Sequence, residues 1–253
     1  METVLCLHAS ASAGRQWRPL SESLGTDYRL LTPDLLGYGD GGFARSGRFS
    51  LDDEVEHVLA QLDDGIERLH VVGHSYGGAV ALRFAQRFPR RVASLTVYEP
   101  AQPLLLFEDG LHTSEAREAR SLREIFVNHA TSTFGRWRAA REYVNYWSGR
   151  DAWQRLTFAR RRRITGLVPK IAAELDALFS ASAALGDVSA LTMPVTILFG
   201  SRTRRTAKRV CELLQERIRG SRLQSIDGLE HMGPLTHAHV VNPLIAEHLG
   251  QAA

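Results

Sequence analysis

The serine in the stretch VVGHSYGG, residues 71–78, is the strongest candidate for chemistry in this sequence. Ser75 follows an apolar, β-branched run and precedes the helical pattern GGAVALRFAQRF. A G-x-S-x-G sequence in that context forms a sharp strand-to-helix turn that strains the serine and exposes its hydroxyl. Gly73, Gly77 and Gly78 would let the helix approach the strand without Cβ clashes. The pattern predicts that Ser75 is a nucleophile, although small residues suit any tight turn of this kind.

A serine hydroxyl is a weak nucleophile at neutral pH unless a base removes its proton, so a histidine must lie near it. Of the ten histidines, His231 is the best candidate, because it lies on the loop DGLEHMGPL just after the apolar run RLQSID. His74 is adjacent to Ser75, but the turn is expected to point it away. We expect His231 to be the base; the alternative is a loop histidine with no catalytic role.

Six short apolar runs predict strands, and the stretches between them carry apolar residues every three or four positions, as helices do. The strands are predicted at residues 3–9, 28–34, 69–75, 94–100, 195–200 and 222–227. This alternation predicts an α/β fold with a mostly parallel central sheet of about six strands, flanked by helices. In such folds ligands bind at the carboxyl ends of the strands, where Ser75 and His231 would meet.

One connection is far longer than the others. It contains roughly ninety residues, whereas a crossover between parallel strands needs about a dozen. We therefore expect a core domain formed by residues 1–100 and 194–253, and a helical cap insertion formed by residues 101–193. The basic run at 159–163 is expected to be a solvated helix face.

The expected cap is rich in aromatic residues, which predicts a partly apolar substrate. Trp137 and Trp147 are the expected substrate contacts. Amphipathic helices also turn aromatic side chains toward their own core, so packing is the alternative role for both.

Composition and charge limit the remaining classes of function. The chain has 253 residues, 44% hydrophobic and 23% charged, as expected of one globular domain. Its net charge is +3, with acidic and basic residues interspersed, so neither nucleic-acid nor membrane binding is expected. The N-terminus lacks the pattern of a signal peptide, which predicts a cytoplasmic protein. Cys6 and Cys211 are expected to be buried, and the oligomeric state is not predicted.

These motifs resemble those of the α/β-hydrolase fold superfamily, and the resemblance extends over nearly the whole chain. Besides GHSYGG it includes LHASASAGRQW near the start, PDLLGYGD at 33–40 and HMGP near the end. The resemblance implies an oxyanion hole formed by the backbone N–H groups of Ser10 and Tyr76. Ala9 stands where the family usually has glycine, and the family's two antiparallel N-terminal strands are expected to be absent.

The acid of the implied catalytic triad departs from the family's pattern. Its usual position, three residues after the glycine of ILFG, is Thr203, which cannot offset the charge of an imidazolium. Glu99 ends the predicted strand SLTVYEP, and some hydrolases of the superfamily resemble this layout. Pro100 favours an extended backbone at Glu99. We expect Glu99 to be the acid; a structural ion pair with an arginine of the insertion is the alternative.

The resemblance implies acyl transfer, with Ser75 as nucleophile, His231 as base and Glu99 as acid, and with neither metal nor organic cofactor. The expected substrate is a small to medium, partly apolar ester or thioester. Amide and carbon–carbon bond hydrolysis stay open, because fold does not decide function. A hydrolase-like ligand-binding module or receptor with little turnover is the alternative from another class, and Thr203 favours it.

Overall fold

A computed structural model of the chain describes residues 1–39, 43, 48–63, 65–180, 188 and 191–252. Asp40, the last residue of the PDLLGYGD motif, lies outside the described residues. So do residues 181–187 and 189–190, near the end of the predicted cap insertion.

The centre of the molecule is a six-stranded sheet with the order β2-β1-β3-β4-β5-β6. Its strands are β1 (Glu2–Leu7), β2 (Tyr28–Leu31), β3 (Leu69–His74), β4 (Val92–Tyr98), β5 (Val195–Gly200) and β6 (Arg222–Ile226). All five neighbouring pairs are parallel. The prediction of six strands in a parallel sheet is therefore confirmed. Because every strand runs the same way, the loops after β3, β4 and β5 lie at one edge of the sheet.

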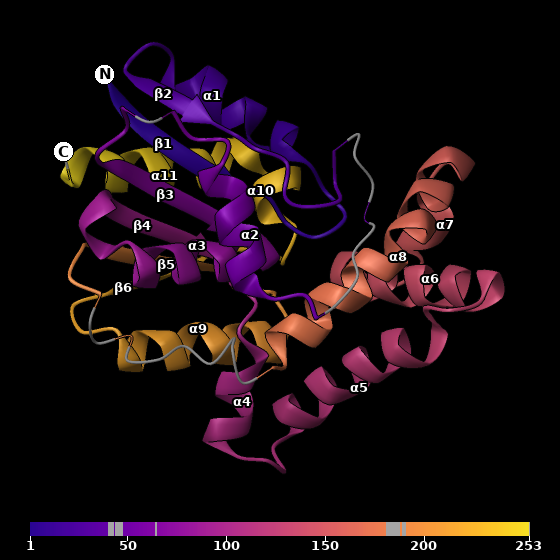
Figure 1. Cartoon of the computed structure of the whole chain (residues 1–253). Coiled ribbons are helices and arrows are strands. Elements are labelled where there is room, and N and C mark those ends of the chain that lie inside the picture. Colours follow the sequence, from indigo (N-terminus) through magenta and orange to yellow (C-terminus); the bar gives the residue numbers. More distant parts are fainter. Residues whose placement is uncertain (40–42, 44–47, 64, 181–187, 189–190, 253) are drawn as a thin grey trace.

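Helices cover both faces of the sheet, as the alternating pattern predicts (Figure 1). One face packs against α1 (Arg18–Leu24) and α11 (Ala238–Gln251). The other packs against α2 (Leu51–Leu59), α3 (Tyr76–Arg87) and α9 (Arg205–Arg217). Short helical turns complete the core: η1 (Gly14–Trp17), η2 (Pro89–Arg91) and α10 (Gly233–Thr236).

The strands are buried on both sides, which explains why their sequences are almost continuously apolar. In β1, Val4 and Cys6 contact the layer of α1 and α11, whereas Leu5 and Leu7 contact the layer of α2 and α3. Both cysteines of the chain are free and buried, as expected.

In the described part of the connection between β4 and β5 there are five helices: α4 (Pro103–Asp109), α5 (Ser114–His129), α6 (Thr133–Ser148), α7 (Ala152–Arg155) and α8 (Phe158–Leu178). Figure 1 shows α5 to α8 gathered to one side of the sheet. These four helices share an apolar cluster of their own, and Phe126, Trp153 and Val168 are among its buried residues. Leu106 of α4 and Leu178 of α8 instead join the main core.

The helix α8 is 21 residues long but includes the four consecutive arginines of the basic run. Across the described part of the chain, no helix has the combination of length and apolar composition that crossing a membrane requires.

Burial of His248 makes the stability of the fold depend on pH. Its Nδ1 lies 2.7 Å from Oγ1 of Thr96 on β4. Burial lowers the pKa of His248 to about 4, from an ordinary value of 6.5. Between those two pH values the unfolded chain binds a proton at this position that the native protein does not. The free energy of unfolding should therefore fall as the pH drops from about 6.5 to about 4.

Urea unfolding at several pH values across that window checks this expectation. In the variant His248→Gln, the free energy of unfolding should fall less steeply as the pH drops. The slope should correspond to up to about one fewer proton taken up on unfolding. His239→Gln is the matched control, because His239 is exposed on the same helix, and it should keep the wild-type slope. A His248→Gln slope equal to that of the wild type would contradict the assignment.

Candidate active site

Ser75 lies in the turn between β3 and α3, with a φ of 54°. That left-handed conformation strains a residue other than glycine, so contacts on both sides must hold it. The N–H of Ser75 donates to the carbonyl oxygen of Tyr98 at 3.0 Å, and its own carbonyl accepts from the N–H of Ala101 at 3.0 Å. The segment after β4 therefore fixes the turn that carries the serine.

The glycines around the turn are required by close backbone approach, as expected. A Cβ on Gly77 would lie 2.3 Å from the carbonyl oxygen of Leu7, and one on Gly73 would lie 2.6 Å from the carbonyl oxygen of Gly77. A Cβ on Gly78 would lie 2.8 Å from Cβ of Pro100. Larger residues would push α3 away from the ends of β1 and β4.

Ser75, His231 and Glu99, which are far apart in the sequence, form one hydrogen-bonded chain. Nε2 of His231 lies 3.0 Å from Oγ of Ser75, and Nδ1 of His231 lies 2.6 Å from Oε2 of Glu99. The contact with a carboxylate assigns the proton of a neutral His231 to Nδ1, so Nε2 accepts from the serine hydroxyl. All three side chains are buried. This is the geometry in which a histidine can take the serine proton.

Glu99 reaches His231 from the end of β4 through a backbone turn with a φ of 43°. The expectation of an extended backbone before Pro100 is therefore wrong. Proline disfavours the right-handed helical region at the preceding residue, and the chain takes the left-handed region instead of the extended one. Among the described residues, the partners of the Glu99 carboxylate are His231, Thr203 and the N–H of Gly200, and no arginine.

Thr203, at the family's usual acid position, contacts the carboxylate that lies near His231. Its Oγ1 donates to Oε2 of Glu99 at 2.7 Å, the same oxygen that contacts His231. The N–H of Gly200 donates to Oε1 at 2.9 Å. Together with His231, these two donors give both oxygens of the carboxyl group a hydrogen-bond partner. The loop after β5 therefore supports a carboxylate supplied by β4.

His74 holds the loop of His231, a role that the sequence did not reveal. Its Nε2 donates to the backbone carbonyl of His231 at 2.9 Å, and its Nδ1 accepts from Nε2 of Gln16 at 3.0 Å. Burial keeps the pKa of His74 well below its usual value, so the ring is neutral. A neutral ring can donate from one nitrogen and accept at the other. Oε1 of Gln16 accepts from the N–H of Ala9 at 3.2 Å. A single chain of hydrogen bonds thus joins the loop after β1 to the loop of His231.

The loop after β1 carries Ser10, and His8 fixes its beginning. Nδ1 of His8 donates to the carbonyl oxygen of Ala9 at 2.8 Å, and its Nε2 accepts from the N–H of Leu35 at 3.0 Å. Burial lowers the pKa of His8 to about 4, so its ring is neutral at pH 7. Ala9 is not among the described residues with positive φ, which explains why alanine can replace the family's glycine there.

Ser10 and Tyr76 both line a small cavity of about 40 Å³ next to Ser75. Tyr76 is the first residue of α3, and the N–H groups of a helix's first turn have no acceptor within the helix. The two residues of the expected oxyanion hole and the serine therefore line the same cavity.

A buried group of charged side chains, Lys170, Glu54 and Glu174, connects α8 to the core and contacts Ser10. Nζ of Lys170 contacts Oε1 of Glu54 and lies 3.3 Å from Oε1 of Glu174. Glu174 accepts from Oγ of Ser10 at 2.6 Å and from the hydroxyl of Tyr38 at 2.7 Å. Burial raises the pKa of Glu174. Glu54, Lys170 and Glu174 lie in stretches whose sequence is typical of an exposed helix surface. The sequence therefore did not predict that they are buried.

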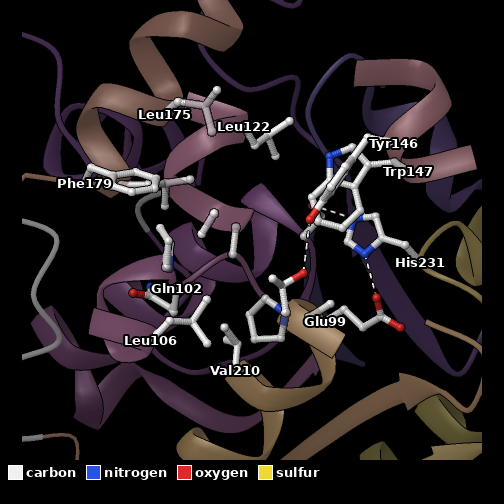
Figure 2. A pocket seen from close by; sticks show the side chains of 18 residues that line it. Glu99, Gln102, Leu106, Leu122, Tyr146, Trp147, Leu175, Phe179, Val210 and His231 are labelled. Atoms are coloured by element: carbon white, nitrogen blue, oxygen red, sulfur yellow. Dashed lines mark hydrogen bonds and ion pairs between the residues drawn. The ribbon is translucent and has the colours of Figure 1, made fainter. Parts of the chain in front are cut away.

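Two larger cavities meet at Ser75 and His231. One, of about 80 Å³, is lined mainly by apolar side chains, including Leu106, Leu122 and Val210 (Figure 2). The other, of about 490 Å³, lies beside the loop after β1 and the start of α8. Trp147 lines both and stacks on the ring of His231, with ring centres 3.9 Å apart.

Trp137, the second expected substrate contact, lies elsewhere. Its ring packs edge to face against Trp153, with the two ring centres 5.0 Å apart. It is not among the described residues that line the cavities at Ser75. Its place in the apolar cluster of α5 to α8 agrees with packing, the alternative role, because helical aromatic residues turn toward the core of their own bundle.

The comparisons with known proteins agree with the fold. The sequence model of the alpha/beta hydrolase fold family matches residues 2–238, so this chain belongs to that family. The solved enol-lactonase from Burkholderia xenovorans superposes with a TM-score of 0.76 at 17% identity, covering 98% of this chain and 91% of that one.

Curated relatives match over shorter stretches. The lipase LipV of Mycobacterium tuberculosis is 37% identical over 117 residues, which is 46% of this chain and 42% of the relative. The 2-hydroxymuconate semialdehyde hydrolase of a Pseudomonas species is 30% identical over 133 residues, or 49% of this chain and 47% of the relative. The matches therefore span less than half the length of these two relatives.

The buried contact between Lys170 and its two carboxylates predicts a large effect of removing the cation. In Lys170→Met, Glu54 and Glu174 would remain buried without their counter-charge, which costs about 3–5 kcal/mol in comparable pairs. Urea unfolding measures this loss. Lys208→Met is the matched control, because Lys208 pairs with Glu212 at the surface, and its cost should be about 1 kcal/mol or less.

The double variant Lys170→Met/Glu54→Gln should recover part of the lost stability, because it removes one of the uncompensated charges. A Lys170→Met protein as stable as the wild type would show that the buried contact does not tie α8 to the core.

Proposed function

We propose that this protein is a serine hydrolase that cleaves an ester or thioester of a small to medium, partly apolar substrate through an acyl-enzyme intermediate. The observation that carries the proposal is the hydrogen-bonded chain from Ser75 through His231 to Glu99, with distances of 3.0 and 2.6 Å. Membership of the alpha/beta hydrolase fold family supports it. The names of two relatives, a lipase and a semialdehyde hydrolase, are consistent with hydrolysis.

In the acylation step, Oγ of Ser75 attacks the carbonyl carbon while Nε2 of His231 takes the hydroxyl proton. The new C–O bond pushes the carbonyl electron pair onto oxygen, which gives a tetrahedral oxyanion. The carboxylate of Glu99 stabilises the imidazolium that forms at the same time. Collapse of the intermediate breaks the bond to the alcohol or thiol, which leaves with the proton from His231.

In the deacylation step, His231 takes a proton from water, and the resulting hydroxide attacks the acyl carbon. The second tetrahedral intermediate expels Ser75, which regains its proton from His231. The acid product leaves and the resting state returns. Every proton in this cycle passes through Nε2 of His231, so the mechanism proposed here needs the tautomer that Glu99 favours.

The N–H groups of Ser10 and Tyr76 are the proposed donors to the oxyanion. Their support is the small cavity that both residues share with Ser75. Such donors typically contribute about 3–4 kcal/mol each to transition-state stabilisation. The hydrogen bond from Ser10 to Glu174 would then hold this loop in place against the buried charges of α8.

The apolar cavity is the proposed site for the apolar part of the substrate (Figure 2). Residues 101–193 would act as a cap, because α5, α6 and α8 supply Leu122, Trp147 and Leu175 to its wall. Trp147, stacked on His231, would contact the substrate at the reacting bond.

The competing function is a binding module with the same fold and little turnover. Threonine at the usual acid position is the feature that favoured it. Thr203 donates to Glu99, and this contact supports a functioning carboxylate instead. A module without turnover would have no requirement for a buried carboxylate aligned with His231, although it could retain the pocket.

The proposal predicts a covalent acyl intermediate on Ser75. Mixing the protein with 4-nitrophenyl butyrate should give a burst of 4-nitrophenol followed by steady turnover. Mass spectrometry after an acid quench should locate a butyryl group on the peptide that contains Ser75. Ser75→Ala should lose the adduct and roughly 10⁴-fold or more of kcat, as serine nucleophiles do elsewhere.

Ser23→Ala is the matched control, because Ser23 is exposed on α1, and it should keep wild-type kinetics. Binding of the ester by the wild-type protein without adduct or turnover would overturn the proposal and favour the binding module.

A further inference from the structure

The larger cavity at Ser75 carries an unbalanced positive charge. Arg15, Arg160 and Arg163 line it together with the two reacting residues Ser75 and His231. None of the described residues that line this cavity is an aspartate or glutamate. The basic run was expected to be a solvated helix face, and its arginines are indeed largely exposed, but two of them also face the site.

These three guanidinium groups have no ion-pair partner among the described residues. Other exposed arginines of this protein contact a carboxylate: Arg18 bonds Glu22 at 2.8 Å, and Arg222 bonds Glu247 at 3.1 Å. Arg161, within the same basic run, donates instead to backbone carbonyls at the end of α7. The arginines of the cavity are thus available to a ligand.

The arginines come from two different elements, which places positive charge on more than one wall of the cavity. Arg15 belongs to η1 in the core, whereas Arg160 and Arg163 belong to α8. Residues three apart lie on the same face of a helix, so Arg160 and Arg163 point to the same side. A guanidinium group offers a planar fork of donors that matches the oxygens of a carboxylate or phosphate.

The two cavities therefore differ in chemistry although both open onto Ser75 and His231. One is apolar, with leucine, valine and phenylalanine side chains. Glu99 is the single carboxylate among the described residues that line it, none of these is a lysine or arginine, and Glu99 already contacts His231. The other is larger and cationic. A substrate whose carbonyl lies at Ser75 would extend its two ends into these different surroundings.

We propose that the substrate has two chemically distinct ends, an apolar group in the smaller cavity and an anionic group, carboxylate or phosphate, bound by Arg15, Arg160 and Arg163. This inference rests on the proposed function and specifies its substrate class. The anionic end is held by exposed arginines, so its contribution to binding falls as salt screens the charges.

The test measures binding without turnover. Isothermal titration of Ser75→Ala with 4-carboxyphenyl butyrate and with 4-acetylphenyl butyrate compares two esters of similar size, one anionic and one neutral. The anionic ester should bind roughly tenfold more tightly at low ionic strength, as expected for a few solvent-exposed charge pairs. Adding Arg15→Gln, Arg160→Gln and Arg163→Gln together should abolish that preference and leave the neutral ester unaffected.

Arg162→Gln in the Ser75→Ala background is the matched control. It removes the same charge from the same helix, but Arg162 does not line the cavity, so the preference should persist. Equal affinity for both esters, or a preference that survives the triple arginine substitution, would overturn the inference. Repeating the titration with 4-phosphonophenyl butyrate compares a carboxylate with a phosphonate, and tighter binding of the phosphonate would favour a phosphate-like group over a carboxylate.

Turnover by the otherwise unmodified enzyme separates this inference from the proposed function. Hydrolysis of both esters at equal kcat/KM would leave the hydrolase proposal standing and overturn the anionic specificity. Selective binding of the anionic ester without hydrolysis of either would support the anionic site and overturn the hydrolase proposal. A kcat/KM that is higher for the anionic ester and falls with added salt would support both.

Discussion

The carboxylate of Glu99 has to reach Nδ1 of His231 from the end of β4, and much of the surrounding structure follows from that requirement. The distance of 2.6 Å leaves no room for another group between them. The backbone at Glu99 adopts a positive φ, and the chain then returns past Ser75, whose carbonyl accepts from Ala101. The acid and the serine are therefore positioned by one short segment, and a shift of either would displace the other.

The histidine is held from several directions because a loop alone would not place it accurately. Tyr98 donates its hydroxyl to the carbonyl of Glu230 at 2.8 Å, and His74 donates to the carbonyl of His231 at 2.9 Å. The two donors are the last residues of β4 and β3, two buried neighbouring strands in the middle of the sheet. Through Gln16, the same contacts extend to the loop that carries Ser10. A rigid second layer of this kind is what holds reacting groups in a productive geometry.

The fold and the three interacting side chains could be predicted because they depend on local patterns and on chain order. Strand periodicity, the glycines of the turn and the position of His231 after β6 are all visible in the sequence. The choice of Glu99 followed from the absence of a carboxylate at Thr203 together with the rule that strand ends meet at one edge. The contact from Thr203 to Glu99 could not be foreseen, since it depends on how two loops approach each other.

Other features could not be predicted from the sequence, because they depend on contacts between residues that are far apart in the chain. A buried pair such as Lys170 and Glu54 joins residues over a hundred positions apart, and each alone is typical of a helix surface. Trp137 and Trp147 lie ten positions apart on one helix, yet only Trp147 reaches the site, because the rotation of a helix against its neighbours is not encoded by spacing alone. The positive φ at Glu99 likewise arises from tertiary contacts that outweigh the local preference before proline.

The measurement that tests the central claim most directly is the kcat/KM of Glu99→Gln for an activated ester, compared with that of Thr203→Val. Glutamine keeps the shape of the acid but removes its charge and disturbs the tautomer of His231, so activity should fall roughly 10³- to 10⁴-fold. Thr203→Val removes one hydrogen bond to the same carboxylate and should cost about tenfold or less. A Glu99→Gln enzyme within tenfold of the wild type would contradict the account, because His231 would then not depend on the carboxylate at the end of β4.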